Sequence, residues 1–357
     1  MNKKLQMDRL QQYAVPLLSI VLGILIGAII MLVYGYDPVA GYTAMVRGAL
    51  FTPFYVGQTL RQMAPLIVIA LGFAVANIAG FFNIGVAGQV LVGWLSSIWV
   101  ATLFPDLPSF ILMPLSVLAG MVGGAIWAGI AGVLRAFFDT SEVIVTIMLN
   151  HIALHVVNHV IRNVLTENSD STARISEAAS LRIPFLTSLT DNSTIHGGIF
   201  ISFIMVFVVW VLINKTTVGF ELRSVGLNTD AADYAGMNAK KNIILAMLLS
   251  GALAGLGGAM EGLGNFQNIF TQGAIPSLGF DGMGVALLGA SNPIGILFSA
   301  FLFSVLKTGG SSMPLIAGVP NEIVDIVIAL IIFFVGANYI IRLLITKTKQ
   351  TKKKEVA

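Results

Sequence analysis

The chain has 357 residues, of which 56% are hydrophobic and only 10% are charged. Soluble domains carry about 25% charged residues, so this composition excludes an ordinary soluble domain and indicates an integral membrane protein. The net charge of +3 comes from basic residues in flanks and loops, a pattern of membrane topology that gives no reason to expect a nucleic-acid partner. Cysteine is absent, which excludes disulfide bonds and thiolate metal sites.

Apolar runs long enough to cross a lipid bilayer recur from one end of the chain to the other. Lys3, Lys4 and Arg9 precede the first run, which is too long for a signal peptide and lacks a small-residue cleavage site, so we expect an uncleaved span. We predict an all-α integral membrane protein of about ten transmembrane helices, several of them short or interrupted. The predicted spans are 14–34, 64–80, 88–104, 110–134, 143–163, 197–213, 242–262, 278–291, 293–308 and 322–344.

Basic residues predict the orientation of these spans. If residues 1–13 are cytoplasmic, fourteen of the 20 Lys and Arg residues lie inside, including those of a basic cytoplasmic tail at 346–357. The positive-inside rule therefore favours ten crossings with both termini cytoplasmic. This count needs a break at Ser291-Asn292-Pro293, where proline interrupts the helix. The basic residues expected outside are Arg47, Arg61, Arg162, Arg174, Arg182 and Lys307.

Two long segments are predicted on the outer side. Part of 37–63 is expected to lie as an amphipathic helix on the membrane surface, and the polar segment 162–196 is expected to be a loop, either facing a partner or mobile. Ten crossings divide into five plus five, and both halves hold an interrupted glycine-rich segment, at 81–85 and 280–284. The chain is therefore a candidate for an inverted repeat.

A charged island, residues 216–241, separates two apolar spans and lies on the predicted cytoplasmic side. Asn228, Thr229 and Asp230 are helix-capping residue types, Ala231–Ala235 favour a helix, and Gly236 can end it. A helix of one or two turns does not persist alone in water. The island therefore predicts a short helix that docks against a soluble partner.

The first candidate for a solute pathway is the interrupted segment 80–89. Broken helices expose backbone groups that survive at membrane depth only inside protein or beside a cavity. Asn83 and Gln89 can pair with those groups or with a polar solute, and Phe82 lies beside them. A tight turn with close helix packing explains each of these residues equally well.

The fifth span carries a second candidate, with polar residues in an otherwise apolar helix. Asn150 is followed by His151, His155 and His159, which are four residues apart and so form one stripe. Ionisable residues are costly inside a membrane and usually face the interior or water. The stripe could line a wet path, relay protons or bind a metal, although no Asp or Glu ligand is near. Alternatively, its outer end simply lies at the membrane interface.

The seventh span and its exit form the third candidate. The pairs Gly251/Gly255 and Gly258/Gly262 have the GxxxG spacing of close helix packing. Glu261, amides and an aromatic ring follow at the outer mouth, where they could hold a ring-bearing polar solute or simply begin a solvated loop. The complete set of candidate pathway residues is Phe82, Asn83, Gln89, Asn150, His151, His155, Glu261, Asn265, Phe266 and Asp281.

No arrangement of residues predicts catalysis. Residues 284–291 approach the spacing of a phosphate-binding loop, but Ala290 stands where the required lysine would be, and the flanks are apolar. We therefore predict no catalytic residue, no metal site and no cofactor in this chain, and a translocation role rather than an enzymatic one.

Four motifs together make the chain resemble a permease of the ABC importers for branched-chain amino acids and simple sugars, and most specifically the bacterial nucleoside permeases. The resemblance covers residues 15–342, with one departure at Ala87, where nucleoside permeases commonly carry an acidic residue. The motifs are Phe82-Asn83-Ile84-Gly85 with Gly88-Gln89, 142–150 with Thr146, 219–228 with Ala231-Ala232 and Gly236, and Phe280-Asp281-Gly282 with Gly289 and Asn292-Pro293.

The resemblance implies a multi-pass protein of the bacterial plasma membrane, with one permease domain over 14–345. A second permease subunit, often in a heterodimer, two cytoplasmic subunits that bind ATP and Mg²⁺, and an extracytoplasmic substrate-binding lipoprotein would complete the transporter. The loop 214–241 would then couple to the ATPase. The coupling residues that the resemblance implies are Glu221, Arg223, Gly226, Asn228, Asp230, Ala231, Ala232 and Gly236.

Nucleoside uptake by alternating access is the function that this resemblance favours. Ribose, galactose or branched-chain amino acid uptake is the alternative within the same class, because substrate selection would lie largely in the binding protein. A proton-coupled secondary transporter that uses the histidine stripe is the alternative from a different class. A membrane scaffold is a third possibility, against which the interrupted spans argue.

Overall fold

The computed structural model describes residues 2–337, with side chains from residue 16 onward, and every regular element in that range is helical. The prediction of an all-α membrane protein is confirmed. The α-helices are α1 (Asn2–Val33), α2 (Pro38–Leu50), α3 (Pro53–Ile78), α4 (Val86–Leu103), α5 (Ser109–Phe138), α6 (Glu142–Val160), α7 (Pro184–Leu189), α8 (Gly198–Lys215), α9 (Thr217–Leu227), α10 (Thr229–Tyr234), α11 (Ala239–Met260), α12 (Ser277–Leu288), α13 (Pro293–Gly310), α14 (Met313–Ala317) and α15 (Asn321–Gly336).

Within residues 2–337, eight helices are long and apolar enough to cross a membrane, and the two remaining predicted spans coincide with the shorter helices α12 and α15. Two of the eight spans continue beyond their α-helix as single π-helical turns, Ile161–Leu165 after α6 and Glu261–Phe266 after α11. The fold therefore agrees with about ten crossings. The end of the predicted span 322–344 and the predicted tail 346–357 lie outside the described residues.

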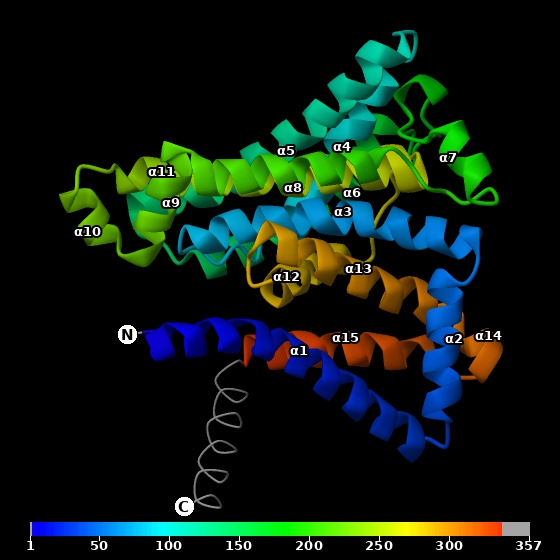
Figure 1. The fold of residues 1–357 in the computed structure, drawn as a ribbon. Coiled ribbons are helices and arrows are strands. Elements are labelled where there is room, and N and C mark those ends of the chain that lie inside the picture. The colour runs from blue at the N-terminus through cyan, green and yellow to red at the C-terminus, as the bar shows by residue number, and fades with distance from the viewer. Residues whose placement is uncertain (1, 338–357) are drawn as a thin grey trace, which may run out of the picture.

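The long helices lie side by side, with the short elements gathered at opposite ends of the bundle (Figure 1). One end carries α9 and α10, and α1 also begins there. The other end carries α2, α7 and α14. The predicted separation of the charged island from the two long outer segments is therefore present in the fold, and the two ends correspond to the two membrane faces.

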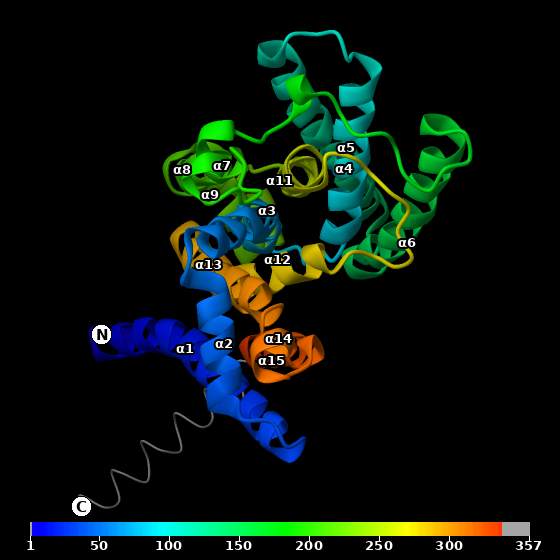
Figure 2. The ribbon, with the colours of Figure 1, turned by 90° about the vertical axis from the view of Figure 1, so that its right-hand side faces the viewer.

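Helix α11 lies at the centre of the bundle, among α3, α4 and α5 (Figure 2). Its glycines allow backbones to approach closely, because a side chain at Gly255 would meet the backbone of Gly120 and lie 3.1 Å from the Cα of Gly124. Gly251 likewise faces Gly124. The GxxxG pair predicted for close packing therefore does pack closely, and dispersion forces between these backbones stabilise the centre of the bundle.

The predicted start of the second span, at residue 64, is wrong. Helix α3 begins at Pro53, because the Thr52 hydroxyl caps the Tyr55 backbone N–H at 3.3 Å and proline is well suited to the first helical turn. Only α2, capped by Asp37, remains of the expected surface segment 37–63. Arg61 consequently lies inside a membrane helix, and so does Lys307 on α13, although both were expected outside.

The outer segment, residues 171–197, is also more structured than a loop. Its backbone N–H groups at Thr172 and Ile175 donate to the carbonyls of Ile269 and Gln267, at 2.9 and 2.8 Å. Ile175 and Leu181 are buried, so the segment has apolar contacts of its own. The expected loop at 162–196 therefore packs and hydrogen-bonds against the bundle, with two short helices, Glu177–Ala179 and α7, within it. The hydrogen bonds join residues about ninety positions apart, which no local pattern reveals.

Replacing Gly255 with valine is expected to lower the melting temperature of the purified protein in detergent. The added side chain would collide with the backbone of α5, and such overpacking costs about 1–3 kcal/mol. Gly336→Val is the matched control, because nothing lies within 4 Å of a Cβ added to Gly336. Equal melting temperatures for the two variants would contradict the close packing of α11.

Candidate functional site

A cavity of about 300 Å³ with a mixed apolar and charged lining lies between α3, α4, α12, α13 and the π-helical turn that follows α11. Segments from all along the chain meet there, and they bring two carboxylates, one ammonium group, side-chain amides and aromatic rings into one space. The residues that give the cavity its chemistry are Gln62, Trp94, Glu261, Phe266, Asp281 and Lys307. We call this space the inner pocket.

One wall of the inner pocket is aromatic. The rings of Trp94 and Phe266 stack with centroids 5.1 Å apart and an angle of 18°, and Phe270 meets both edge-on. The Trp94 indole N–H donates to the carbonyl of Asn268 at 2.8 Å, which fixes the orientation of the stack. Phe266 is 47% exposed and lines the pocket, so part of its side chain remains accessible there.

The opposite part of the inner pocket is charged and balanced. Lys307 forms an ion pair with Asp281, and Glu261 accepts a hydrogen bond of 2.8 Å from the Asn265 amide. Arg61, on α3, lies close enough to Glu261 for their charges to interact. Charged groups inside a membrane protein usually pair with one another and mark solute or ion pathways. The arrangement is typical of a pathway through the protein.

A second cavity of about 440 Å³ adjoins the inner pocket on the outer side. It is lined by the first turns of α3, including Tyr55 and Arg61, and by Ser311 after α13. Gln62 and Lys307 line both cavities, so these two side chains lie at the boundary between them. The pair of cavities therefore outlines a route from the outer end of the bundle to the inner pocket.

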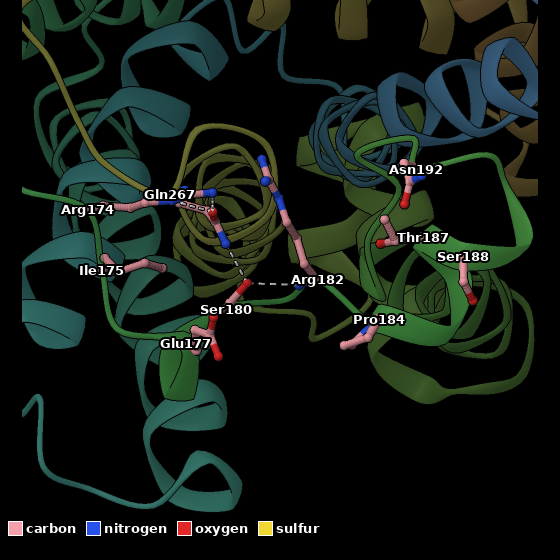
Figure 3. A pocket seen from close by; sticks show the side chains of 10 residues that line it. All are labelled: Arg174, Ile175, Glu177, Ser180, Arg182, Pro184, Thr187, Ser188, Asn192 and Gln267. Carbon is pink, nitrogen blue, oxygen red and sulfur yellow. Dashed lines mark hydrogen bonds between the residues drawn. The ribbon is translucent and has the colours of Figure 1, made fainter.

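A third cavity, of about 570 Å³, lies under the outer segment (Figure 3). Here the Arg182 guanidinium donates hydrogen bonds of 2.9 and 2.7 Å to the carbonyls of Gly264 and Asn265. These two carbonyls, at the end of the π-helical turn, thereby gain hydrogen-bond partners. Arg174 donates to the Gln267 side chain, whose amide donates in turn to the Ser180 hydroxyl at 2.7 Å. The outer segment therefore fastens the turn that carries Glu261 and Phe266.

His196, at the end of the outer segment, has no counterpart among the predicted site residues. It is fully buried, and its Nδ1 accepts a hydrogen bond of 3.1 Å from the backbone N–H of Gly198. Burial, together with the positive charge of Arg61, lowers the pKa of this imidazole to about 4. The His196 side chain is therefore neutral at neutral pH.

The amides of the interrupted segment are engaged with the protein itself. Asn83 donates to Ser250 at 2.9 Å, exchanges hydrogen bonds with Gln89 at 3.0 and 3.1 Å, and accepts from the Gly85 N–H at 3.0 Å. Asn150 accepts from the Gly88 N–H at 2.8 Å and donates to the Ile84 carbonyl at 2.9 Å. We call Asn83, Gln89, Asn150 and Ser250 the amide network. It satisfies the backbone where α3 ends and α4 begins.

The remaining candidate pathway residues lie elsewhere. Phe82 is 38% exposed and packs edge-on against Phe73, with centroids 5.1 Å apart. His151, His155 and His159 are all exposed on α6, on the face opposite buried Asn150. The structure thus brings Glu261, Phe266 and Asp281 together in the inner pocket, with Asn265 bonded to Glu261, but not the histidines. Among the described residues, no group of three or more His, Asp or Glu side chains is placed to bind a metal.

Residues of the inner pocket that sequence reasoning missed are Gln62, Trp94 and Lys307. Trp94 lies in an ordinary apolar run, and Lys307 was expected outside the membrane. The unbalanced carboxylates Glu261 and Asp281 in apolar helices could have suggested a cationic partner, because a lone buried charge is costly. Only the folded structure shows that Lys307 pairs with Asp281 and that Arg61 lies near Glu261.

At the opposite end of the bundle, the predicted short helix is present as α10. The Asn228 side chain accepts the Ala231 N–H at 2.9 Å, and Gly236 ends the helix with φ +85°, a conformation that favours glycine. Asp230 and Ala231 are exposed and Ala232 is buried. Leu227, the last residue of α9, and Tyr234, the last residue of α10, are 88% and 96% exposed, so two large bare side chains flank this short helix.

Helix α9 connects α10 to the bundle. Gly226 lies directly on the end of α3, where an added Cβ would come within 2.9 Å of the Gly80 nitrogen. Glu221 accepts a hydrogen bond of 2.9 Å from Asn242 at the start of α11, and Arg223 is half-buried. Any displacement of α10 therefore reaches α3 and α11 through direct contacts.

An all-helical membrane domain with a pocket lined by charged, amide and aromatic side chains, and with a short exposed helix between two spans, fits a membrane transport subunit. The chain belongs to the family described as branched-chain amino acid transport system / permease component, whose model matches residues 55–336.

Several relatives of the chain are permease proteins of ABC transporters. The chain is 49% identical to the guanosine permease NupP of Bacillus subtilis over 96% of this chain and 98% of that protein. It is 49% identical to the nucleoside permease NupB of Lactococcus lactis over 98% and 97%. The glucose permease TsgB13 of Haloferax volcanii is 34% identical over 94% and 91%. No solved structure matches the chain.

Replacing Asn83 with alanine is expected to destabilise the protein, because Gln89, Ser250 and the Gly85 N–H would lose partners at membrane depth. Each buried polar group left unpaired costs about 1–3 kcal/mol. Thermal unfolding in detergent measures the loss. The control is Asn214→Ala on α8, an exposed amide bonded to the Trp210 carbonyl. An Asn83 variant as stable as that control would refute the structural role of the amide network.

Proposed function

We propose that this chain is the pore subunit of an ABC importer that takes up nucleosides by alternating access, driven by separate ATPase subunits. The observation that carries the proposal is the nearly full-length likeness to a guanosine permease and a nucleoside permease. The exposed helix α10 at one end of the bundle and the two adjoining cavities at the other support it. A permease that is driven by a separate ATPase needs both a contact surface for that ATPase and a passage for the solute. ATP and Mg²⁺ belong to the partner subunits.

The end of the bundle that carries α10 would face the cytoplasm. Lys215, Lys240 and Lys241 follow or precede spans at this end, as the positive-inside rule requires. Leu227 and Tyr234 would enter an apolar groove of the ATPase. Closure of the ATPase dimer would then press Gly226 against the end of α3, and α3 carries Gln62 at the boundary of the inner pocket.

A second permease subunit, in a heterodimer, would cover the exposed face of α6. His151 and His155 lie there among exposed Met148 and Ile152, within a helix long and apolar enough to span the membrane. Contact with lipid would leave the imidazoles without hydrogen-bond partners, which is costly in hydrocarbon. A protein partner or a wet path between two subunits removes that cost.

The outer end of the bundle would receive the solute from an extracytoplasmic binding lipoprotein. The outer segment, α2 and α14 form this end (Figure 1). Because the outer segment is hydrogen-bonded to the turn that carries Phe266, docking of the lipoprotein there can reach the inner pocket through a short, rigid connection.

Purification in mild detergent and uptake by proteoliposomes test the function. We expect the ATPase subunits to co-purify with this chain, and the complete transporter with its binding protein to accumulate radiolabelled guanosine when ATP is inside the vesicles. Unlabelled nucleosides should compete, whereas glucose and leucine should not. Competition by glucose or leucine alone would contradict the substrate, and uptake that protonophores abolish would contradict the ATP-driven class.

Within that assay, Gly226→Ala is expected to reduce guanosine uptake at least tenfold while the ATPase still co-purifies. The added methyl group would displace α9 from the backbone at the end of α3. Gly336→Ala, with open space around its Cβ, should transport normally. Wild-type uptake by the Gly226 variant would exclude this contact from the coupling path.

The absence of cysteine in the native chain makes the α6 interface directly testable. A photoactivatable benzophenone attached to His155→Cys should capture the second permease subunit in membranes. The same label on Phe207→Cys, exposed on α8 at the other side of the bundle, should capture mainly lipid (Figure 2). Capture of lipid alone from position 155 would refute a protein partner on α6.

A further inference from the structure

We propose that the inner pocket is a binding site for the nucleoside within the permease, with the base stacked on Phe266 and the ribose hydroxyls bonded near the Asp281–Lys307 pair. The inference rests on the proposed function and adds a specific solute site to it. The chain would then contact its solute chemically instead of providing only an inert passage.

The aromatic wall suits a nucleobase. Phe266 is fixed on one side by the parallel ring of Trp94 and on its edge by Phe270, so its exposed face is a rigid platform. Stacking depends little on the identity of the base, because every base has a π-face. Such a platform would bind different nucleosides, whereas a sugar without a base would gain no stacking energy from it.

The polar wall suits the ribose. The Asp281 carboxylate accepts hydrogen bonds from hydroxyl groups, and the Lys307 ammonium donates to them. The amides of Gln62 and Gln272, which also line the pocket, can do either. The aromatic and polar walls belong to the same cavity of about 300 Å³, which is at the lower end of the range for small-molecule sites.

The charge balance of the pocket indicates that its solute is uncharged. Lys307 is already paired with Asp281, and Glu261 is bonded to Asn265 beside the Arg61 charge, so a neutral molecule enters without leaving an ion unpaired. A nucleoside monophosphate would bring its phosphate charge next to two carboxylates. The pocket therefore favours the nucleoside over its phosphate.

The position of the pocket places the site on the solute route. Lys307 and Gln62 separate the inner pocket from the outer cavity of about 440 Å³. A solute that enters from the outer cavity passes Gln62 and Lys307 and then meets the Asp281–Lys307 pair and the ring of Phe266 in the same pocket.

Saturation-transfer NMR with guanosine as the probe tests the site directly, using the complete transporter complex in detergent without its binding protein. We expect transfer to the base proton from the wild-type complex, its loss in Phe266→Ala and its recovery in Phe266→Trp. Phe298→Ala, which removes an exposed ring from α13, is the control and should match wild type. Guanosine monophosphate should fail to displace the signal.

Uptake of guanosine with the binding protein present gives the second readout. Phe266→Ala should lower kcat/KM for uptake by about 5- to 140-fold, the range found when one stacked base loses its aromatic partner, and Phe266→Trp should restore it. Co-purification of the ATPase shows that each variant is assembled.

The outcomes separate the two proposals. If the wild-type transporter imports guanosine and Phe266→Ala does so at the same rate with the same NMR signal, the site is wrong and the function stands. If the wild-type transporter imports no nucleoside, the proposed function fails and the site fails with it.

Discussion

The interrupted connection between α3 and α4 imposes the constraint on which the rest of the structure depends. Backbone groups freed at membrane depth must find partners inside the protein, since lipid provides none. Asn83 and Asn150 supply those partners to Gly85, Gly88 and Ile84. Because this network fixes where α4 begins, it also fixes the position of Trp94, two turns along α4, and with it the aromatic wall of the inner pocket.

The two working ends of the protein share the same helices. Helix α3 meets α9 at Gly226 at one end and carries Gln62 towards the other, while α11 begins beside Glu221 and ends in the turn with Glu261 and Phe266. The glycine contacts of α11 leave little room for bending at the centre. In the proposed mechanism, a force applied at α10 would therefore move α3 and α11 as rigid units and change the inner pocket and the outer segment together.

Features that depend on local sequence could be predicted. The apolar lengths predicted the eight helices that are long enough to span a membrane in the described part of the chain, and the shorter α12 and α15. The capping residues from Asn228 to Gly236 predicted α10, because hydropathy and capping act within one element. Features that join distant segments could not. The Asp281–Lys307 pair spans 26 positions, and the hydrogen bond from Thr172 to Ile269 spans 97. For the same reason, the sequence did not reveal that the histidine stripe on α6 faces away from the pocket.

We propose that this protein is a membrane passage without an energy source of its own, moved through α10 by a partner. Guanosine accumulation is measured in proteoliposomes that contain either the purified permease subunits alone or the complete ATP-supplied transporter with its binding protein. We expect guanosine to rise above the external concentration only in the complete system. Accumulation against a gradient by the permease subunits alone, driven by a proton gradient, would refute the proposal.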